Sequence, residues 1–500
     1  MTCKPLKKSY QRSSSFFYSA IYRLFYTMNI YPNRTLALLV LLAAHLLTIV
    51  DIFIVNIAIP SVQQGLTGSD GEMQLVVAMY MVGFASCLIA AGRAGDHYGR
   101  KKIFLAGMSM FMLSSAGCGL AGTPGQLILL RFVQGCSAGL MSPQVLAFIH
   151  LLFPGHGERT HAIGWYGMTI GIGTMSGQFL GGLLVELHPL WVDQSWRYIF
   201  LVNIPVCLGA LMLGKRYLPA VEDRMTEKMD YTGALLVSAA LILLVFSLTA
   251  GMEQPVYLVY TLPLSLLLFC RFGWLQRHRR RQGRHMLVNP GLFAYWNFNL
   301  AILAAALFMF MLDAYFFVLA IFLQTGLHLP PLKAGFFVVF QGAGFMLASL
   351  IAPRLVLRFG KAVLISGVLF IALALALQLL LFTWPANPPA GYAVMVLHGF
   401  GVALVLPSFA NIAMKGLPTE LVGNASGVYT TAQQLFGALG ISLTGGLFYH
   451  LMNLQQQSCK FLHAFAWSTL VHLVCLGGVL VALLVLPGMV LPKISGKTAP

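Results

Sequence analysis

The chain has 500 residues, of which 58% are hydrophobic and 9% are charged, whereas soluble domains are about 45–50% apolar and about 25% charged. This composition excludes a soluble protein and indicates an integral membrane protein. A net charge of +17 would suggest nucleic-acid binding in a soluble protein. Here the basic residues flank apolar segments, so we expect the lipid bilayer as a partner and no nucleic acid.

Fourteen apolar runs are long enough to span a bilayer, which takes about 20 apolar residues. They fall near 35–60, 72–91, 103–122, 126–150, 161–186, 198–214, 230–250, 256–274, 298–325, 332–353, 361–383, 389–414, 423–449 and 464–486. Most of the 31 lysine and arginine residues lie in alternate loops, on the side that also holds both chain ends. The positive-inside rule therefore predicts an all-α polytopic protein with both termini in the cytoplasm. We interpret the run Arg277–Arg284 as one of these topology anchors.

The stretch Gly92–Phe104 joins the second and third runs and combines glycines with a basic cluster. We predict a tight cytoplasmic turn here, because glycine tolerates positive φ and close backbone approach. Its candidate residues are Gly92, Gly95, Asp96, Gly99, Arg100, Lys101 and Lys102.

An internal repeat relates the N-terminal and C-terminal halves of the chain. Three landmarks recur at a nearly constant separation: Tyr98-Gly99-Arg100 as Phe359-Gly360-Lys361, Pro143 as Pro407, and Gly181-Gly182 as Gly445-Gly446. We predict two six-helix bundles, which is the architecture of rocker-switch transporters with a central site. The expected units are a basic cytoplasmic tail 1–34, a bundle 35–214, a linker with two extra transmembrane helices 215–297, a bundle 298–486 and a cytoplasmic tail 487–500.

Charged residues within spans are costly and therefore mark candidate functional sites. Asp51 in the first run and Arg131 in the fourth lie at depths that differ by roughly one helical turn. Gln134, one turn from Arg131, is level with Asp51. We predict that Asp51 contacts Arg131 or Gln134, and we assign proton coupling to Asp51.

Asp313 lies near the middle of the ninth run, beside Tyr315 and Phe316, and no basic residue shares its span. An ionised carboxylate without a cation is costly there, which suits a group that loads and releases a proton. The alternative is a carboxylate that lines a wet cavity without titrating. We expect Gln134, Tyr315 and Phe316 to line the substrate cavity.

Other chemistry finds no support in the residues. The histidines lack metal-ligand spacing, and no phosphate-binding glycine loop, Ser-His-Asp set or zinc helix is evident. We therefore expect no catalytic residue, no metal and no cofactor. The fifth run carries glycines at four-residue steps, which let helices approach closely in lipid: Gly173, Gly177, Gly181 and Gly182. They indicate either simple packing or a flexible gate between the bundles.

Several stretches together resemble the fourteen-helix drug:proton antiporter branch of the major facilitator superfamily. They are the Gly92–Lys101 loop (motif A), Val50-Asp51-Ile52-Phe53-Ile54-Val55-Asn56, Leu130-Arg131-Phe132-Val133-Gln134-Gly135 (motif B), Gly173–Gly182 (the antiporter motif C), Trp196–Pro205 and Asp230-Tyr231-Thr232-Gly233. The resemblance implies that motif A forms an inner gate and that Arg131 takes part in proton transfer. His97 and Gln178 depart from the branch, which usually has arginine and proline at these positions.

The expectation is thus a proton-coupled exporter of small amphipathic drugs or metabolites in a bacterial inner membrane. The proton gradient would supply the energy, and one chain would function as a monomer. The alternative is a dedicated transporter of one metabolite or siderophore, acting as an importer or uniporter. A non-transporting receptor or membrane enzyme would need a soluble domain or a catalytic cluster, and the loops are too short for either.

Overall fold

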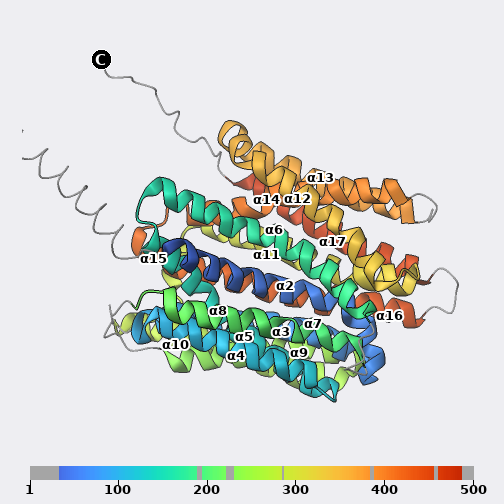
Figure 1. Cartoon of the computed structure of the whole chain (residues 1–500), viewed down its shortest axis with the longest axis horizontal. Helices are drawn as coiled ribbons and strands as arrows, with labels where there is room; N and C mark the ends of the chain where they lie inside the picture. The colour runs from blue at the N-terminus through green and yellow to red at the C-terminus, as the bar shows by residue number, and fades with distance from the viewer. Residues whose placement is uncertain are drawn as a thin grey trace, which may run out of the picture.

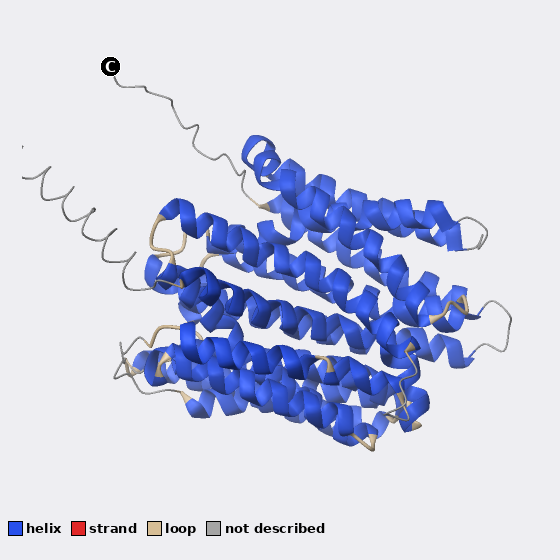
Figure 2. Cartoon of the chain, viewed as in Figure 1, coloured by secondary structure: helices blue, strands red, loops and turns tan. Residues whose placement is uncertain are grey.

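The computed structural model describes residues 33–187, 194–220, 230–283, 286–382, 388–454 and 460–486. Within these ranges helices are the only regular elements (Figure 2). Fourteen helical segments of this part of the chain are long and apolar enough to cross a membrane. The prediction of an all-α fold with fourteen spans is confirmed.

The helices follow one another in three groups. The first comprises α2 (Arg34–Leu66), α3 (Asp70–Tyr98), α4 (Arg100–Leu120), α5 (Pro124–Leu152), α6 (His156–Glu186), η1 (Ser195–Arg197), α7 (Tyr198–Leu201) and α8 (Asn203–Tyr217). The extra pair is α9 (Tyr231–Glu253) and α10 (Pro255–Arg281). The last group comprises η2 (Pro290–Ala294), α11 (Trp296–Ile321), η3 (Phe322–Gly326), α12 (Pro331–Phe359), α13 (Lys361–Phe382), α14 (Pro388–Met414), α15 (Thr419–Gly440), η4 (Ile441–Gly445), α16 (Gly446–Leu454) and α17 (Lys460–Val485).

Figure 1 shows α12, α13, α14 and α17 on one side of the molecule and α3, α4, α5 and α8 on the other, with α2, α6 and α11 between them. The predicted unit boundaries and the cytoplasmic location of the chain ends stay predictions. Of the two predicted tails, residues 1–32 and 487–500 lie outside the described part.

The turn within motif A lies near its end and involves fewer residues than the stretch Gly92–Phe104. Helix α3 continues through Gly92 and Gly95 to Tyr98, and α4 begins at Arg100. Only Gly99 separates the two helices, with φ of 97°, a value that side chains disfavour. The predicted tight turn is therefore present, but it is confined to Gly99. Gly92 and Gly95 lie inside α3, where a Cβ on Gly95 would collide with the side chain of Gln144.

The same close helix contacts recur in both bundles. Gly135 on α5 leaves no room for a Cβ against the carbonyl oxygen of Tyr80 on α3. Gly399 on α14 is equally close to the carbonyl oxygen of Gln341 on α12. The internal repeat predicted from sequence landmarks is therefore present as repeated backbone packing.

The repeat extends to the helix ends. Lys101 at the start of α4 donates to the carbonyl oxygen of Lys215 at 2.8 Å, near the end of α8. Lys361 at the start of α13 donates to the carbonyl oxygen of Leu484 at 3.3 Å, near the end of α17. Both lysines satisfy carbonyl groups that helix ends leave without intrahelical partners.

The extra pair packs on one bundle and reaches the other. Glu253 at the end of α9 accepts a hydrogen bond from the backbone N–H of Gly71 on α3 at 2.7 Å. Thr249 on α9 donates to Ser442 of η4 at 2.7 Å. Helix α10 covers α9 and exposes large apolar side chains, for example Tyr260 at 72%. We expect this face of α10 to contact lipid.

Candidate functional site

Asp51 lies in the middle of α2 with no exposed surface. Its Oδ1 accepts hydrogen bonds from Gln134 Nε2 at 2.9 Å and from Asn203 Nδ2 at 2.8 Å. Arg131 Nη1 donates to its Oδ2 and forms a buried ion pair. Both contacts that the sequence predicted for Asp51 are confirmed, whereas Asn203 was quoted in a motif and given no role.

The guanidinium of Arg131 is as completely buried as its partner. Its Nε donates to the carbonyl oxygen of Val76 at 3.2 Å, and Nη1 also donates to Gln134 Oε1 at 2.8 Å. Its Cζ lies 4.3 Å from the ring centroid of Tyr80, a cation–π geometry. A charge pair without water needs such additional partners, so this network fixes α2 against α3 and α5.

A cavity of about 100 Å³ lies where the two bundles meet, between α2, α3 and α6 on one side and α11, α12, α14 and α15 on the other. Four polar side chains line it: Thr174, Asp313, Gln341 and Gln434. Its other side chains are apolar and include Phe53, Met81, Met309, Phe316 and Phe345. Sites for drug-sized ligands are typically about 300–1,000 Å³. The cavity is therefore too small in this structure for a drug-sized ligand and would have to widen to admit one.

Asp313 is the acidic residue of this cavity and is 4% exposed. Within the described part of the chain, no hydrogen bond or ion pair joins its carboxyl group to another residue. Gly437 on α15 faces the carboxyl group so closely that a Cβ there would collide with Oδ2. Asp313 thus combines a cavity position, burial and the lack of a cation.

The three residues predicted to line the substrate cavity lie in different places. Phe316 lines it. Gln134 belongs instead to the Asp51 network within the first bundle. Tyr315 is fully buried on the other face of α11, where its hydroxyl group and Gln378 share a hydrogen bond. Sequence reasoning missed Thr174, Gln341 and Gln434, whose only signal was a polar side chain within an apolar run.

The predicted gate residues cluster at the end of the bundle where α3 meets α4. Arg100 donates to Asp96 Oδ1 at 3.0 Å in an ion pair between half-exposed side chains. Lys101 donates hydrogen bonds to backbone carbonyl oxygens at the end of α8. Gly92 has open space where a side chain would lie. These contacts lie within the first bundle and tie its helix ends together.

The glycines of α6 provide close packing at the bundle interface. Gly173, Gly177 and Gly181 face Ile49, the Val50 carbonyl oxygen and the Ile54 carbonyl oxygen on α2. Gly182 faces the other bundle, at the carbonyl oxygen of Pro331 on α12. Helix α6 is therefore held between α2 and α12, directly beside the cavity.

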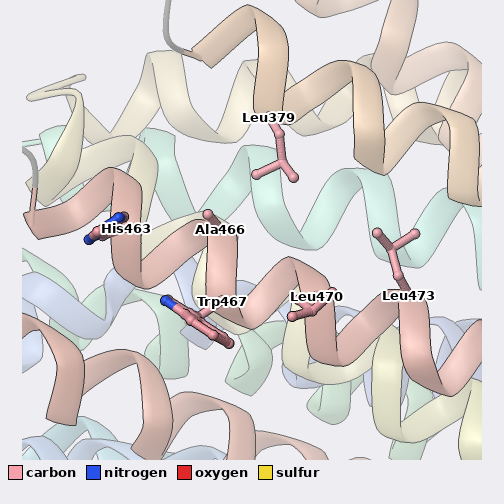
Figure 3. Close-up of a pocket in the computed structure, with 6 residues that line it drawn as sticks. All are labelled: Leu379, His463, Ala466, Trp467, Leu470 and Leu473. Carbon is pink, nitrogen blue, oxygen red and sulfur yellow. The ribbon is translucent and has the colours of Figure 1, made fainter.

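Among the described residues, no group of three or more His, Cys, Asp or Glu side chains is arranged to hold a metal ion. A groove of about 300 Å³ lies between α13 and α17, and Figure 3 shows Leu379 on one side and His463, Ala466, Trp467, Leu470 and Leu473 on the other. Trp467 is 52% exposed on this outer surface. We expect the groove to face lipid and place no substrate there.

Comparisons with known proteins give consistent matches. The sequence model of the Major Facilitator Superfamily matches residues 41–441. The puromycin resistance protein pur8 of Streptomyces alboniger is 35% identical over 424 residues, which cover 82% of this chain and 81% of that protein. The probable actinorhodin transporter of Streptomyces coelicolor is 30% identical over 439 residues, which cover 85% and 74%. A solved D-xylose–proton symporter matches with a TM-score of 0.63 at 15% identity, over 90% of this chain and 96% of that one; this likeness concerns the fold alone.

Proposed function

Since this chain belongs to the Major Facilitator Superfamily, we propose that it exports small amphipathic compounds, drugs or metabolites, in exchange for protons. Its fourteen spans make it a multi-pass protein of the cell membrane. One relative is named for resistance to puromycin and another for transport of actinorhodin. Both names support export of organic compounds.

The observation that carries the proposal is the buried carboxyl group of Asp313 in the cavity between the bundles, where no described residue pairs with it. When ionised, it attracts a cationic substrate strongly, because the surrounding dielectric is low. When protonated, it loses that attraction. A proton and a cationic or neutral amphipathic compound would therefore alternate at the same place as the bundles rock around it.

The Asp51–Arg131 pair supports a second role for protons. Protonation of Asp51 would leave the buried guanidinium of Arg131 without its counter-charge, which is strongly unfavourable. Relief requires Arg131 to move or to be rehydrated. Proton binding at Asp51 would therefore be linked to movement of α2 against α5.

The remaining predicted residues take supporting roles in this proposal. The motif A residues Gly92, Asp96, Gly99, Arg100 and Lys101 would hold the inner ends of the first bundle in a defined arrangement. The glycines of α6 would let that helix slide between α2 and α12 as the cavity opens. The membrane field contributes about 2.3 kcal/mol per charge per 100 mV, and no cofactor takes part. One chain contains both bundles, so we propose that a monomer functions.

The test is efflux of ethidium, an amphipathic cation, from bacterial cells that produce the protein. We expect protonophore-sensitive efflux, lost in Asp313→Asn. The control is Glu158→Gln, which changes a carboxylate at the start of α6 that is 50% exposed and far from the cavity chemistry. Normal efflux by Asp313→Asn at equal abundance would refute the role of Asp313. Absence of ethidium efflux in the unaltered protein would favour a dedicated carrier of one metabolite.

A further inference from the structure

A second buried polar cluster lies inside the other bundle. His398 on α14 and His472 on α17 are 0% and 1% exposed. The ring of His398 stacks on Tyr315 of α11 with centroids 4.4 Å apart, and His472 packs edge-on against the same tyrosine at 6.1 Å. Two imidazoles thus share one aromatic ring in an apolar interior.

None of the four ring nitrogens of His398 and His472 has a hydrogen-bond partner among the described residues. The neighbouring polar groups are already engaged, since Gln378 donates to the Tyr315 hydroxyl group at 2.9 Å. A neutral imidazole carries one donor and one acceptor nitrogen. Buried polar groups without partners are rare and mark a missing water, an ion or a functional role.

The internal repeat shows which position this cluster occupies. On α2, Ile49 packs against Gly173 of α6; on α11, Asp313 packs against Gly437 of α15. Asp313 therefore stands at the repeat position of Ile49, and both line the cavity. Two residues further along, Tyr315 stands where the first bundle has Asp51.

The other members follow from contacts that both bundles share. His398 precedes Gly399 as Gln134 precedes Gly135, and these two glycines make equivalent contacts. Lys361 caps the carbonyl group of Leu484, and Lys101 caps that of Lys215. His472 precedes Leu484 by as many residues as Asn203 precedes Lys215. His472 is therefore equivalent to Asn203 of the first bundle. The second bundle thus has Tyr315, His398 and His472 at the positions of the Asp51 network.

We propose that His398 and His472 together bind one proton, so that each bundle has its own proton site. The proton adds to the lone pair of a ring nitrogen on one imidazole. The two rings are not hydrogen-bonded to each other in this structure, so a rotation of the side chains would let the resulting N–H donate to a nitrogen of the other ring. The cationic ring rests on Tyr315, as the guanidinium of Arg131 rests on Tyr80 in the first bundle. The role of this proton in antiport rests on the proposed function.

The cluster lies behind the cavity wall, on the opposite face of α11. His398 precedes Gly399 and Tyr315 precedes Phe316, and both following residues line the cavity wall. The four helices of the cluster carry other titratable groups. Asp313 lies on the cavity face of α11, and Cys475 lies about one turn from His472 on α17. The remaining ones lie near helix ends: Lys361, Tyr392, Lys460 and His463.

The experiment is a pH titration of the full-length protein in lipid nanodiscs, with histidine labelled by carbon-13 at Cε1 and read by NMR. Loss of a signal in His398→Gln or His472→Gln assigns each resonance. A perturbation of both signals in Tyr315→Phe assigns them if those variants do not fold. We expect the two resonances to shift together with one common midpoint within the titrated range, and His472→Gln to move the midpoint of His398.

His45 provides the matched control. It is also buried and stacks on Tyr166 at 4.0 Å. Among the residues that the structure describes, its ring nitrogens have no partner and no second imidazole shares its tyrosine. We expect its resonance to stay constant over the same range. If His398 and His472 also stay constant, with and without ethidium bound, the proposal is overturned. The titration needs no transport, so loss of efflux and loss of this site are distinguishable.

Discussion

The buried pair Asp51–Arg131 gives a quantitative prediction. Asp51→Asn keeps the size of the side chain and removes its charge. Arg131 stays enclosed, with the side-chain oxygen of Gln134 and the backbone carbonyl oxygens of Val76 and residue 51 as neutral acceptors. Removal of one partner of a buried ion pair typically costs about 3–5 kcal/mol. Removal of both charges together is often close to neutral. We therefore expect Asp51→Asn to be strongly destabilised and Asp51→Asn with Arg131→Met to regain most of the loss.

The assay is thermal unfolding in lipid nanodiscs, followed by tryptophan fluorescence. The control is Glu158→Gln, which breaks the exposed pair with Arg34 and should cost less than about 1 kcal/mol. A wild-type unfolding temperature for Asp51→Asn would refute the reasoning. So would a double variant that is less stable than the single one.

Two further predictions concern other contacts. Gly437→Ala should slow ethidium efflux, because the new methyl group must displace the carboxyl group of Asp313. The control is Gly423→Ala, on the same helix with open space around it, which should leave the efflux rate unchanged. Equal rates for the two variants would contradict this prediction. Asp230→Asn should lose the ion pair with Arg279 at 2.7 Å and destabilise the start of α9 by about 1–3 kcal/mol. The expected readout is faster proteolysis between α8 and α9, and an unchanged cleavage rate would count against this prediction.

The sequence was sufficient for the spans and for the first polar network. Apolar run length predicts helices in lipid because each backbone group must be satisfied within its own helix. Asp51 and Arg131 could be paired from depth alone, since both are costly in lipid and lie nearly level. The helical continuation through Gly92 and Gly95 was not predictable, because it depends on the close packing of Gly95 against Gln144 of α5, a residue distant in sequence.

The cavity lining was harder to predict. Tyr315 follows Asp313 by two residues, which turns it roughly 200° around the helix, so adjacency in sequence put it on the wrong face. Gln341 and Gln434 come from two other helices, and only their packing brings them to Asp313. His398 and His472 likewise lie in separate runs, and only the packing of α14 and α17 around Tyr315 brings them together.

The central claim is that substrate leaves in exchange for protons at Asp313. The most direct measurement uses proteoliposomes that contain the purified protein and a pH-sensitive dye, with ethidium supplied on one side. We expect ethidium movement to drive protons in the opposite direction, and Asp313→Asn to abolish this proton movement. Ethidium transport without proton movement, or with protons moving in the same direction, would contradict the account.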